Sequence, residues 1–177
     1  MLATLVDEPF SRQGWLFEPK LDGERCVAIR SGAYVQLFSR NEMQLNNKYP
    51  ELVAAFRRQK SARFVVDGEI VAFKEGVTSF AKLQPRMQVR HPSEELLRSV
   101  PVWIHLFDLL HLDGYDTRQL PLRYRKGLLQ KAWLKSVSRS GLWKASFGIQ
   151  DSWDCALTRS QKKLCGSIAC GRTHRSP

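Results

Sequence analysis

Hydrophobic and polar positions along this chain follow two periods, a two-residue alternation typical of half-buried strands and a wider spacing typical of helices. Strand-like patterns occupy residues 15–21, 26–30, 34–38, 63–73 and 100–114. Helical spacing of apolar side chains occupies residues 50–59 and 122–135, and each run begins at or just after a proline, which suits a first helical turn. These elements predict an α+β fold with mostly antiparallel strands.

Two glycine-containing pairs mark turns near the start of the chain. Ser31-Gly32 lies between the second and third strand-like runs and predicts a hairpin. Asp22-Gly23 is a turn signal directly after the first run, in which Glu18, Lys20 and Asp22 would share one face if the strand continues that far.

The sequence changes character after Lys135. Neither period persists over residues 136–177, which hold seven basic and two acidic side chains. We therefore predict a folded unit over residues 1–135 and a divergent basic tail over residues 136–177, whose fold the pattern leaves open. A zinc site is an alternative for the tail, since it contains four possible ligands: Cys155, Cys165, Cys170 and His174. Their spacing lacks the paired C-x2-C of common zinc sites, so chance cysteines are favoured.

Composition narrows the class of protein. The chain has 177 residues, of which 43% are hydrophobic and 25% charged, values typical of a soluble globular domain. Its apolar runs are too short to span a membrane, and no apolar leader opens it, so we expect a cytoplasmic protein. The net charge of +11 favours a polyanionic partner.

Charged side chains interrupt three of the apolar stretches, where they are costly without partners. In EPKLDGER (residues 18–25), a lysine before an Asp-Gly turn and an arginine is a candidate covalent nucleophile, because neighbouring cations favour its neutral amine. The alternative is a surface turn with an ion pair between Lys20 and Asp22.

The second and third interrupted stretches carry carboxylates and an aromatic ring. In VVDGEIVAF (residues 65–73), Asp67 and Glu69 fall on one face and could take a ribose hydroxyl and a cation; the alternative is a hairpin turn at Asp67-Gly68. In HLFDLLHLDG (residues 105–114), Phe107 could offer its ring to a base, with plain core packing as the alternative.

Taken in order, these segments resemble the nucleotidyltransferase motifs of ATP-dependent DNA ligases and mRNA capping enzymes, beginning with the E-x-K-x-D-G-x-R signature. Three further segments agree, the last two being similar to the ligase domain of bacterial end-joining ligases: SRNE (39–42), SFAKLQPR (79–86) and LPLRYRKGLL (120–129). The resemblance covers about residues 1–135. It implies two antiparallel sheets with flanking helices around a nucleotide cleft.

The resemblance also implies roles. Lys20 matches the lysine that attacks ATP and carries AMP as a phosphoramidate. The residues that match positions around the nucleotide are Glu18 (beside the adenine), Arg25 and Arg40 (ribose and phosphates, or the nick phosphate), Glu69 (ribose) and Phe107 (stacked on the adenine). Mg²⁺ would accompany ATP, and nicked or broken duplex DNA would be the partner, in DNA repair or recombination with end-joining proteins.

The tail departs from the family pattern. The family continues with a glutamate-glycine strand and a W-x-K-x-K strand, and LWKAS (142–146) is only a faint echo of the second. The oligonucleotide-binding barrel is not found either. We therefore expect weak self-adenylation, weak and salt-sensitive DNA binding and no appreciable nick sealing by this chain alone. A capping-type RNA guanylyltransferase and an inactive remnant that binds nucleotide or DNA remain as alternatives.

Overall fold

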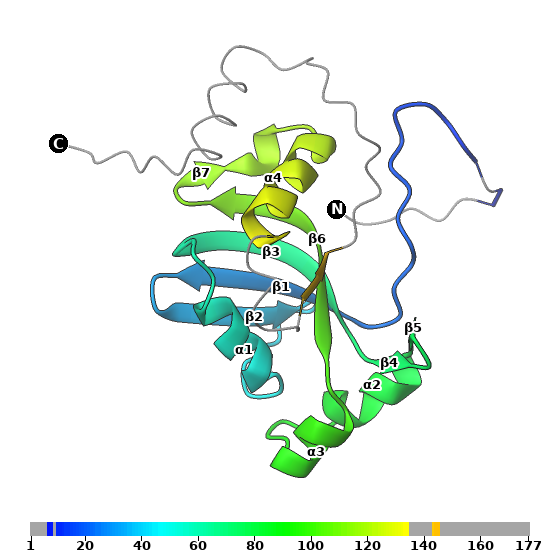
Figure 1. Cartoon of the computed structure of the whole chain (residues 1–177), viewed down its shortest axis with the longest axis vertical. Helices are drawn as coiled ribbons and strands as arrows, with labels where there is room; N and C mark the ends of the chain where they lie inside the picture. The colour runs from blue at the N-terminus through cyan, green and yellow to red at the C-terminus, as the bar shows by residue number, and fades with distance from the viewer. Residues whose placement is uncertain (1–6, 9, 135–142, 146–177) are drawn as a thin grey trace.

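The computed structural model describes residues 7–8 and 10–134, together with the backbone of residues 143–145 (Figure 1). Its strands are β1 (Glu24–Ser31), β2 (Tyr34–Ser39), β3 (Arg63–Val71), β4 (Phe73–Lys74), β5 (Val77–Thr78), β6 (Trp103–Leu112), β7 (Tyr115–Asp116) and β8 (Trp143–Ala145). Its helices are α1 (Pro50–Arg57), α2 (Phe80–Met87), α3 (Glu94–Ser99), the 3₁₀ helix η1 (Thr117–Gln119) and α4 (Leu122–Leu134). No helix in this described part is long and apolar enough to cross a membrane.

The strands form a larger and a smaller sheet. The larger sheet has the order β2-β1-β3-β6-β7, with every neighbour antiparallel, and β8 pairs with β6 in parallel. The smaller sheet is the antiparallel pair of β4 and β5, which lies beside α2 at one end of the molecule (Figure 1). The predicted α+β class with mostly antiparallel strands is therefore confirmed.

One face of the larger sheet carries the core. Alternate positions of β1, β2, β3 and β6 are buried there, because successive side chains of a strand point to opposite faces. Phe64 of β3 contacts both covering helices: its ring lies 5.6 Å from that of Phe56 on α1 and 5.1 Å from that of Trp133 on α4. The spacing that predicted the two helices is thus the spacing of the residues they bury against the sheet.

The opposite face is half-buried and polar. Arg25 on β1 lies directly opposite Glu69 on β3, and Glu69 lies opposite His105 on β6. All three side chains are partly exposed, so they form a polar row across the three central strands. The candidate site is built on this face.

The β3–β6 pairing is irregular where the site lies. Asp67 is opposite Asp108, whereas the next residue, Gly68, is opposite Leu106, so the register skips Phe107. A Cβ at Gly68 would stand 2.4 Å from the carbonyl oxygen of His105, so only glycine permits this approach. The alternative of a hairpin turn at Asp67-Gly68 is wrong, because both residues lie inside one continuous strand.

Along the edge of β6 that faces away from β3, short strands and two side chains supply the hydrogen-bond partners of the backbone. Along that edge, β8 pairs with Ile104–Leu106 and β7 with residues 111–112. Between them, the carbonyl of Leu109 accepts from Thr117 Oγ1 at 2.5 Å and that of Phe107 accepts from Lys126 Nζ at 2.8 Å. Buried carbonyl groups need such partners when a neighbouring strand is missing. Lys126 is thereby fixed at the strand that bears Phe107.

The prediction of a strand over residues 15–21 is wrong. This segment has no regular secondary structure in the described chain. Its apolar side chains meet a nearby ring instead of a sheet: Phe10 lies 4.8 Å from Trp15 and 5.8 Å from Phe17, measured between ring centroids. Alternation alone does not make a strand, because a strand also needs a free edge with which to pair.

Candidate active site

Asp22 and Gly23 dock the lysine-bearing segment onto the rest of the fold. Asp22 Oδ2 accepts the backbone N–H of Phe80, the first residue of α2, at 2.8 Å, and Asp22 N donates to Thr78 Oγ1 at 3.3 Å. Gly23 lies so close to β3 that a Cβ would stand 2.2 Å from the carbonyl oxygen of Ile70. The Asp-Gly pair is therefore a docking point as well as a bend.

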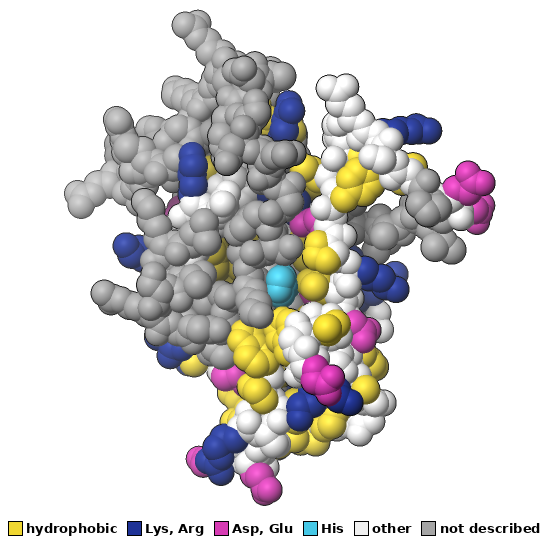
Figure 2. All heavy atoms as spheres, turned by 45° about the vertical axis from the view of Figure 1, so that its right-hand side comes forward, with side chains coloured by type: hydrophobic (Ala, Val, Ile, Leu, Met, Phe, Trp, Pro, Cys, Tyr) yellow, Lys and Arg dark blue, Asp and Glu magenta, His cyan; other side chains and the backbone are white. Residues whose placement is uncertain are grey.

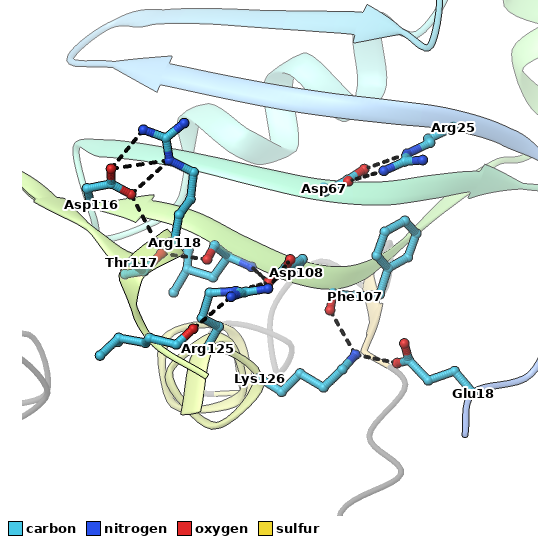
Figure 3. Close-up of polar contacts among 12 residues, drawn as sticks. Glu18, Arg25, Asp67, Phe107, Asp108, Asp116, Thr117, Arg118, Arg125 and Lys126 are labelled. Carbon is cyan, nitrogen blue, oxygen red and sulfur yellow. Dashed lines mark hydrogen bonds and ion pairs between the residues drawn. The ribbon is translucent and has the colours of Figure 1, made fainter. Parts of the chain in front are cut away.

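Glu18 fixes the other end of the same segment. Its carboxylate forms an ion pair with Lys126 of α4 (Figure 3). Lys20 lies between the fixed positions of Glu18 and Asp22, and its side chain is exposed. No described residue forms a hydrogen bond or ion pair with the Lys20 amine, so the alternative of a Lys20–Asp22 ion pair is wrong. The Lys20 amine is therefore exposed to solvent on a short segment that is held at Glu18 and at Asp22.

Arg25 is held by Asp67. The guanidinium makes two parallel hydrogen bonds to the carboxylate, Nε to Oδ1 at 3.1 Å and Nη2 to Oδ2 at 2.6 Å (Figure 3). The hydrogen bond to Asp67 raises the pKa of Arg25, which keeps it cationic. Asp67 is 4% exposed, and both of its carboxylate oxygens accept hydrogen bonds from Arg25, so an arginine balances its charge in this structure.

Glu69 lies beside Arg25 on the polar face and is half-buried. Burial raises the pKa of its carboxyl group, while a backbone hydrogen bond from Gly23 and the charge of Arg25 act in the opposite direction. Its neighbours thus only partly compensate for burial of the carboxylate. A carboxylate in this state is suited to accept hydrogen bonds from a ligand hydroxyl.

Phe107 faces the same region and is not part of the core. Its side chain is half-buried, and its ring points toward the Arg25–Asp67 pair (Figure 3). The Arg25 guanidinium carbon lies 5.9 Å from the ring centroid, within the range of a cation–π contact. The alternative of plain core packing for Phe107 is therefore wrong.

Arg40 lines a hollow that Arg25 also lines. The hollow has a volume of about 480 Å³ and is lined by Arg25, Val27, Phe38, Ser39, Arg40 and Glu42. The SRNE segment makes a tight turn at its rim, in which Glu42 takes a positive φ of 59° and donates its N–H to the carbonyl of Ser39 at 3.0 Å. Two of the predicted site residues, Arg25 and Arg40, thus line one open hollow.

Sequence reasoning missed the partners supplied by α4. Arg125 makes two hydrogen bonds to Asp108, at 2.7 and 2.9 Å, and the next residue, Lys126, holds Glu18 and the carbonyl of Phe107. The signal was present: Asp108 interrupts an apolar strand and needs a cation, and the helix that follows carries two adjacent basic residues.

Arg86, in the segment SFAKLQPR, has a structural role. Its side chain is fully buried and donates to the carbonyl oxygens of Lys48 at 2.8 Å and Val100 at 3.1 Å. It also pairs with Glu51 at 2.8 Å and lies over the ring of Tyr49. Arg86 joins α2 to the start of α1 and therefore supports the fold around the site.

The described residues hold no group of three or more His, Cys, Asp or Glu side chains that could bind a metal ion. The four possible zinc ligands of the tail lie outside the described residues, as do the segments in which the later family motifs were sought, apart from the backbone of β8. On the face of the molecule drawn in Figure 2, acidic and basic side chains are interspersed over the described residues. The positive charge is therefore not gathered into one patch on that face.

Comparison with known proteins identifies the family. A family model for the ATP dependent DNA ligase domain matches residues 1–148. DNA ligase 2 of Thermofilum pendens is 36% identical over 118 residues, which are 66% of this chain and 20% of that protein. DNA ligase C of Mycobacterium tuberculosis is 38% identical over 120 residues, 66% of this chain and 33% of that protein.

Two solved structures of DNA ligases are also similar to this chain. A mycobacterial DNA ligase D complexed with ATP and MES matches 66% of this chain and 36% of its own length, with a TM-score of 0.53 and 29% identity. The ligase domain of M. tuberculosis LigD gives the same TM-score and identity, over 66% of this chain and 35% of that chain. This chain spans 20% and 33% of the two curated relatives named above. The chain belongs to the ATP-dependent DNA ligase family.

Proposed function

We propose that this chain is the nucleotide-binding part of an ATP-dependent DNA ligase and that Lys20 is its covalent nucleophile. The observation that carries the proposal is the setting of Lys20, an exposed amine on a segment anchored at Glu18 and Asp22. Anchoring on both sides limits the positions that the amine can take, and positioning supplies much of the rate in phosphoryl and nucleotidyl transfer.

The proposed first step exchanges one bond to phosphorus for another. The neutral Lys20 amine attacks the α-phosphorus of ATP, and the bond from that phosphorus to the bridging oxygen breaks. Pyrophosphate leaves with the electron pair, the nitrogen loses one proton, and AMP remains as a phosphoramidate. Cations near the phosphates stabilise the charge that moves in this step, and the candidates for this role are Arg25 and Arg40, which line one hollow.

The remaining site residues would bind the nucleoside. Phe107 is the ring on which adenine stacks, by the ring face that Arg25 does not cover. Glu69 accepts a ribose hydroxyl, which its half-buried carboxylate and the neighbouring Gly23 backbone favour. Glu18 lies beside the adenine, fixed there by its ion pair.

The family supports the later steps as well. In a complete ligase, AMP would pass to the 5′-phosphate of nicked or broken duplex DNA, and the 3′-hydroxyl would then displace it. We expect no appreciable sealing by this chain alone. The setting would be DNA repair or recombination, beside end-joining proteins in the cytoplasm. Mg²⁺ would accompany ATP, and the chemistry it would supply is to offset the charge of the phosphates. The family model and the ATP-bound ligase D favour ATP over the GTP of capping enzymes.

Incubation with ATP labelled at the α-phosphate and Mg²⁺ tests the proposal. Wild type is expected to form an acid-labile adduct that peptide mapping assigns to Lys20. Lys20→Arg and Lys20→Ala should both lose it, whereas Lys60→Ala, a change at another exposed lysine, should keep it. Equal labelling of the Lys20 variants would refute the assignment, and thermal unfolding checks that each variant is folded.

A further inference from the structure

Lys126 is a buried cation, and its ammonium group donates hydrogen bonds to two residues of the candidate site. Its side chain is 2% exposed, although it comes from a helix that otherwise packs against the core. It holds the Glu18 carboxylate and, at 2.8 Å, the carbonyl oxygen of Phe107 (Figure 3). A buried ammonium is costly without such compensation, and an apolar side chain there would avoid the cost.

The two partners come from distant parts of the chain. Glu18 belongs to the irregular segment that bears Lys20, and Phe107 to the central strand β6 at the point where its register with β3 shifts. Neither is bonded directly to the other, and within the described chain the ammonium group of Lys126 is the link between them. One side chain of α4 therefore binds both an acidic side chain and the backbone of an aromatic residue.

We propose that Lys126 is a positioning residue for the base of the bound nucleotide. It keeps the Glu18 carboxylate in register with the Phe107 ring, so that a base stacked on the ring meets the acceptor oxygens of Glu18 along its edge. The ion pair uses one carboxylate oxygen, and the Glu18 side chain is 31% exposed, so a ligand can still reach it. An ionised carboxylate only accepts hydrogen bonds, which favours the amino group of adenine over the carbonyl of guanine. This proposal rests on the proposed function, because it concerns the same site.

A purely structural role predicts a different result from a positioning role. Loss of general stability would loosen the phosphate and base parts of the site alike. Loss of positioning would weaken only ligands that carry a base. ATP and inorganic tripolyphosphate separate the two cases, since tripolyphosphate has the phosphates without the nucleoside.

The experiment measures dissociation constants of ATP, GTP and tripolyphosphate by calorimetric titration of the full chain. Lys126→Met replaces the ammonium with an uncharged chain of similar length, and Lys131→Met makes the same change at an exposed position of the same helix. We expect Lys126→Met to raise the dissociation constant for ATP roughly tenfold, as for loss of a hydrogen bond to a charged group. Tripolyphosphate binding should stay as in wild type, the preference for ATP over GTP should fall, and Lys131→Met should match wild type.

Lys126→Arg should restore part of the ATP affinity, because a guanidinium can still donate to both partners. Lys126→Gln, whose amide can donate to the Phe107 carbonyl, replaces the methionine variant if that variant does not fold. Combining Lys126→Met with Glu18→Gln should cost little more than Glu18→Gln alone if the lysine acts through the glutamate.

Equal weakening of ATP and tripolyphosphate, or unchanged ATP affinity in Lys126→Met, would overturn the proposal. A wild-type chain that binds ATP without labelling Lys20 would refute adenylation, while the ratio of ATP to tripolyphosphate affinity would still decide the role of Lys126. A wild-type chain that does not bind ATP would overturn both.

Discussion

Gly23→Ala is a small change at the point where the lysine-bearing segment docks on the sheet. The new Cβ would stand 2.2 Å from the carbonyl oxygen of Ile70, and 2.9 Å from side-chain carbons of Glu69 and Val71. The first contact is the decisive one, because it is with backbone. β3 lies between β1 and β6 and is hydrogen-bonded to both, so the docked segment must move rather than the strand.

The geometry gives the size of the effect. Ordinary contact between such atoms begins near 3.4 Å, so the segment must retreat by about 1 Å. Overpacking of this kind costs about 1–3 kcal/mol, which lowers the melting temperature of a chain this size by roughly 2–12 °C. A displacement of about 1 Å at a reacting group can cost on the order of 100-fold in rate. We therefore expect adenylation of Lys20 to slow far more than stability alone would suggest.

The assay follows the rate of AMP labelling under single-turnover conditions at a temperature where each variant is folded. Gly14→Ala is the matched control, since Gly14 lies in the same part of the chain with open space around it and a φ of +86°. It should cost about 1 kcal/mol through backbone strain and leave the labelling rate near that of wild type. Wild-type labelling by Gly23→Ala, with an unchanged melting temperature, would refute the docking of this segment on β3.

Three further predictions follow from the site. Phe107→Ala should weaken ATP binding by roughly 1–3 kcal/mol through lost stacking, and unchanged affinity on titration would exclude the ring from the base site. Burial raises the pKa of Glu69, so the ionised carboxylate lowers the stability of the fold at neutral pH. Glu69→Gln should therefore raise the melting temperature near neutral pH. This gain should shrink as the pH falls through the pKa of Glu69 in the folded state. A gain that does not depend on pH would contradict this cause. Arg125→Ala leaves Asp108, whose side chain is 9% exposed, without its paired cation, and should destabilise the fold by about 3–5 kcal/mol in urea unfolding. Arg118→Ala breaks a solvent-exposed pair and should change the stability little. Similar losses in the two variants would refute the difference between the buried and the exposed pair.

Much of the fold follows from local pattern. The hairpin at Ser31-Gly32, the helix beginning at Pro50, the strands around Gly68 and Phe107, and the final helix are all present close to the predicted residues. Each of these elements buries one face, so the spacing of its apolar residues shows directly whether it is a helix or a strand. The helices α2 and α3 were missed because each is short and buries few residues.

The fold also brings together several of the residues that the family motif named as candidates. Arg25, Glu69 and Phe107 lie together on the polar side of the sheet, and Arg40 shares a hollow with Arg25. Spacing in the motif is reliable here because β1 and β3 are adjacent antiparallel strands, so the parity of each position fixes the face on which it lies.

The sequence by itself therefore determined the elements, their buried faces and the list of candidate residues, since these depend on periods of a few residues. Only the tertiary structure decided how charges are shared: Arg25 neutralises Asp67, Arg125 neutralises Asp108, and Lys126 joins Glu18 to Phe107. It likewise decided that residues 15–21 form an anchored irregular segment although they alternate like a strand. The physical reason is the same in each case, because strand pairing and charge pairing depend on groups distant in the sequence, and a local pattern shows that a buried charge needs a partner without showing which partner it has.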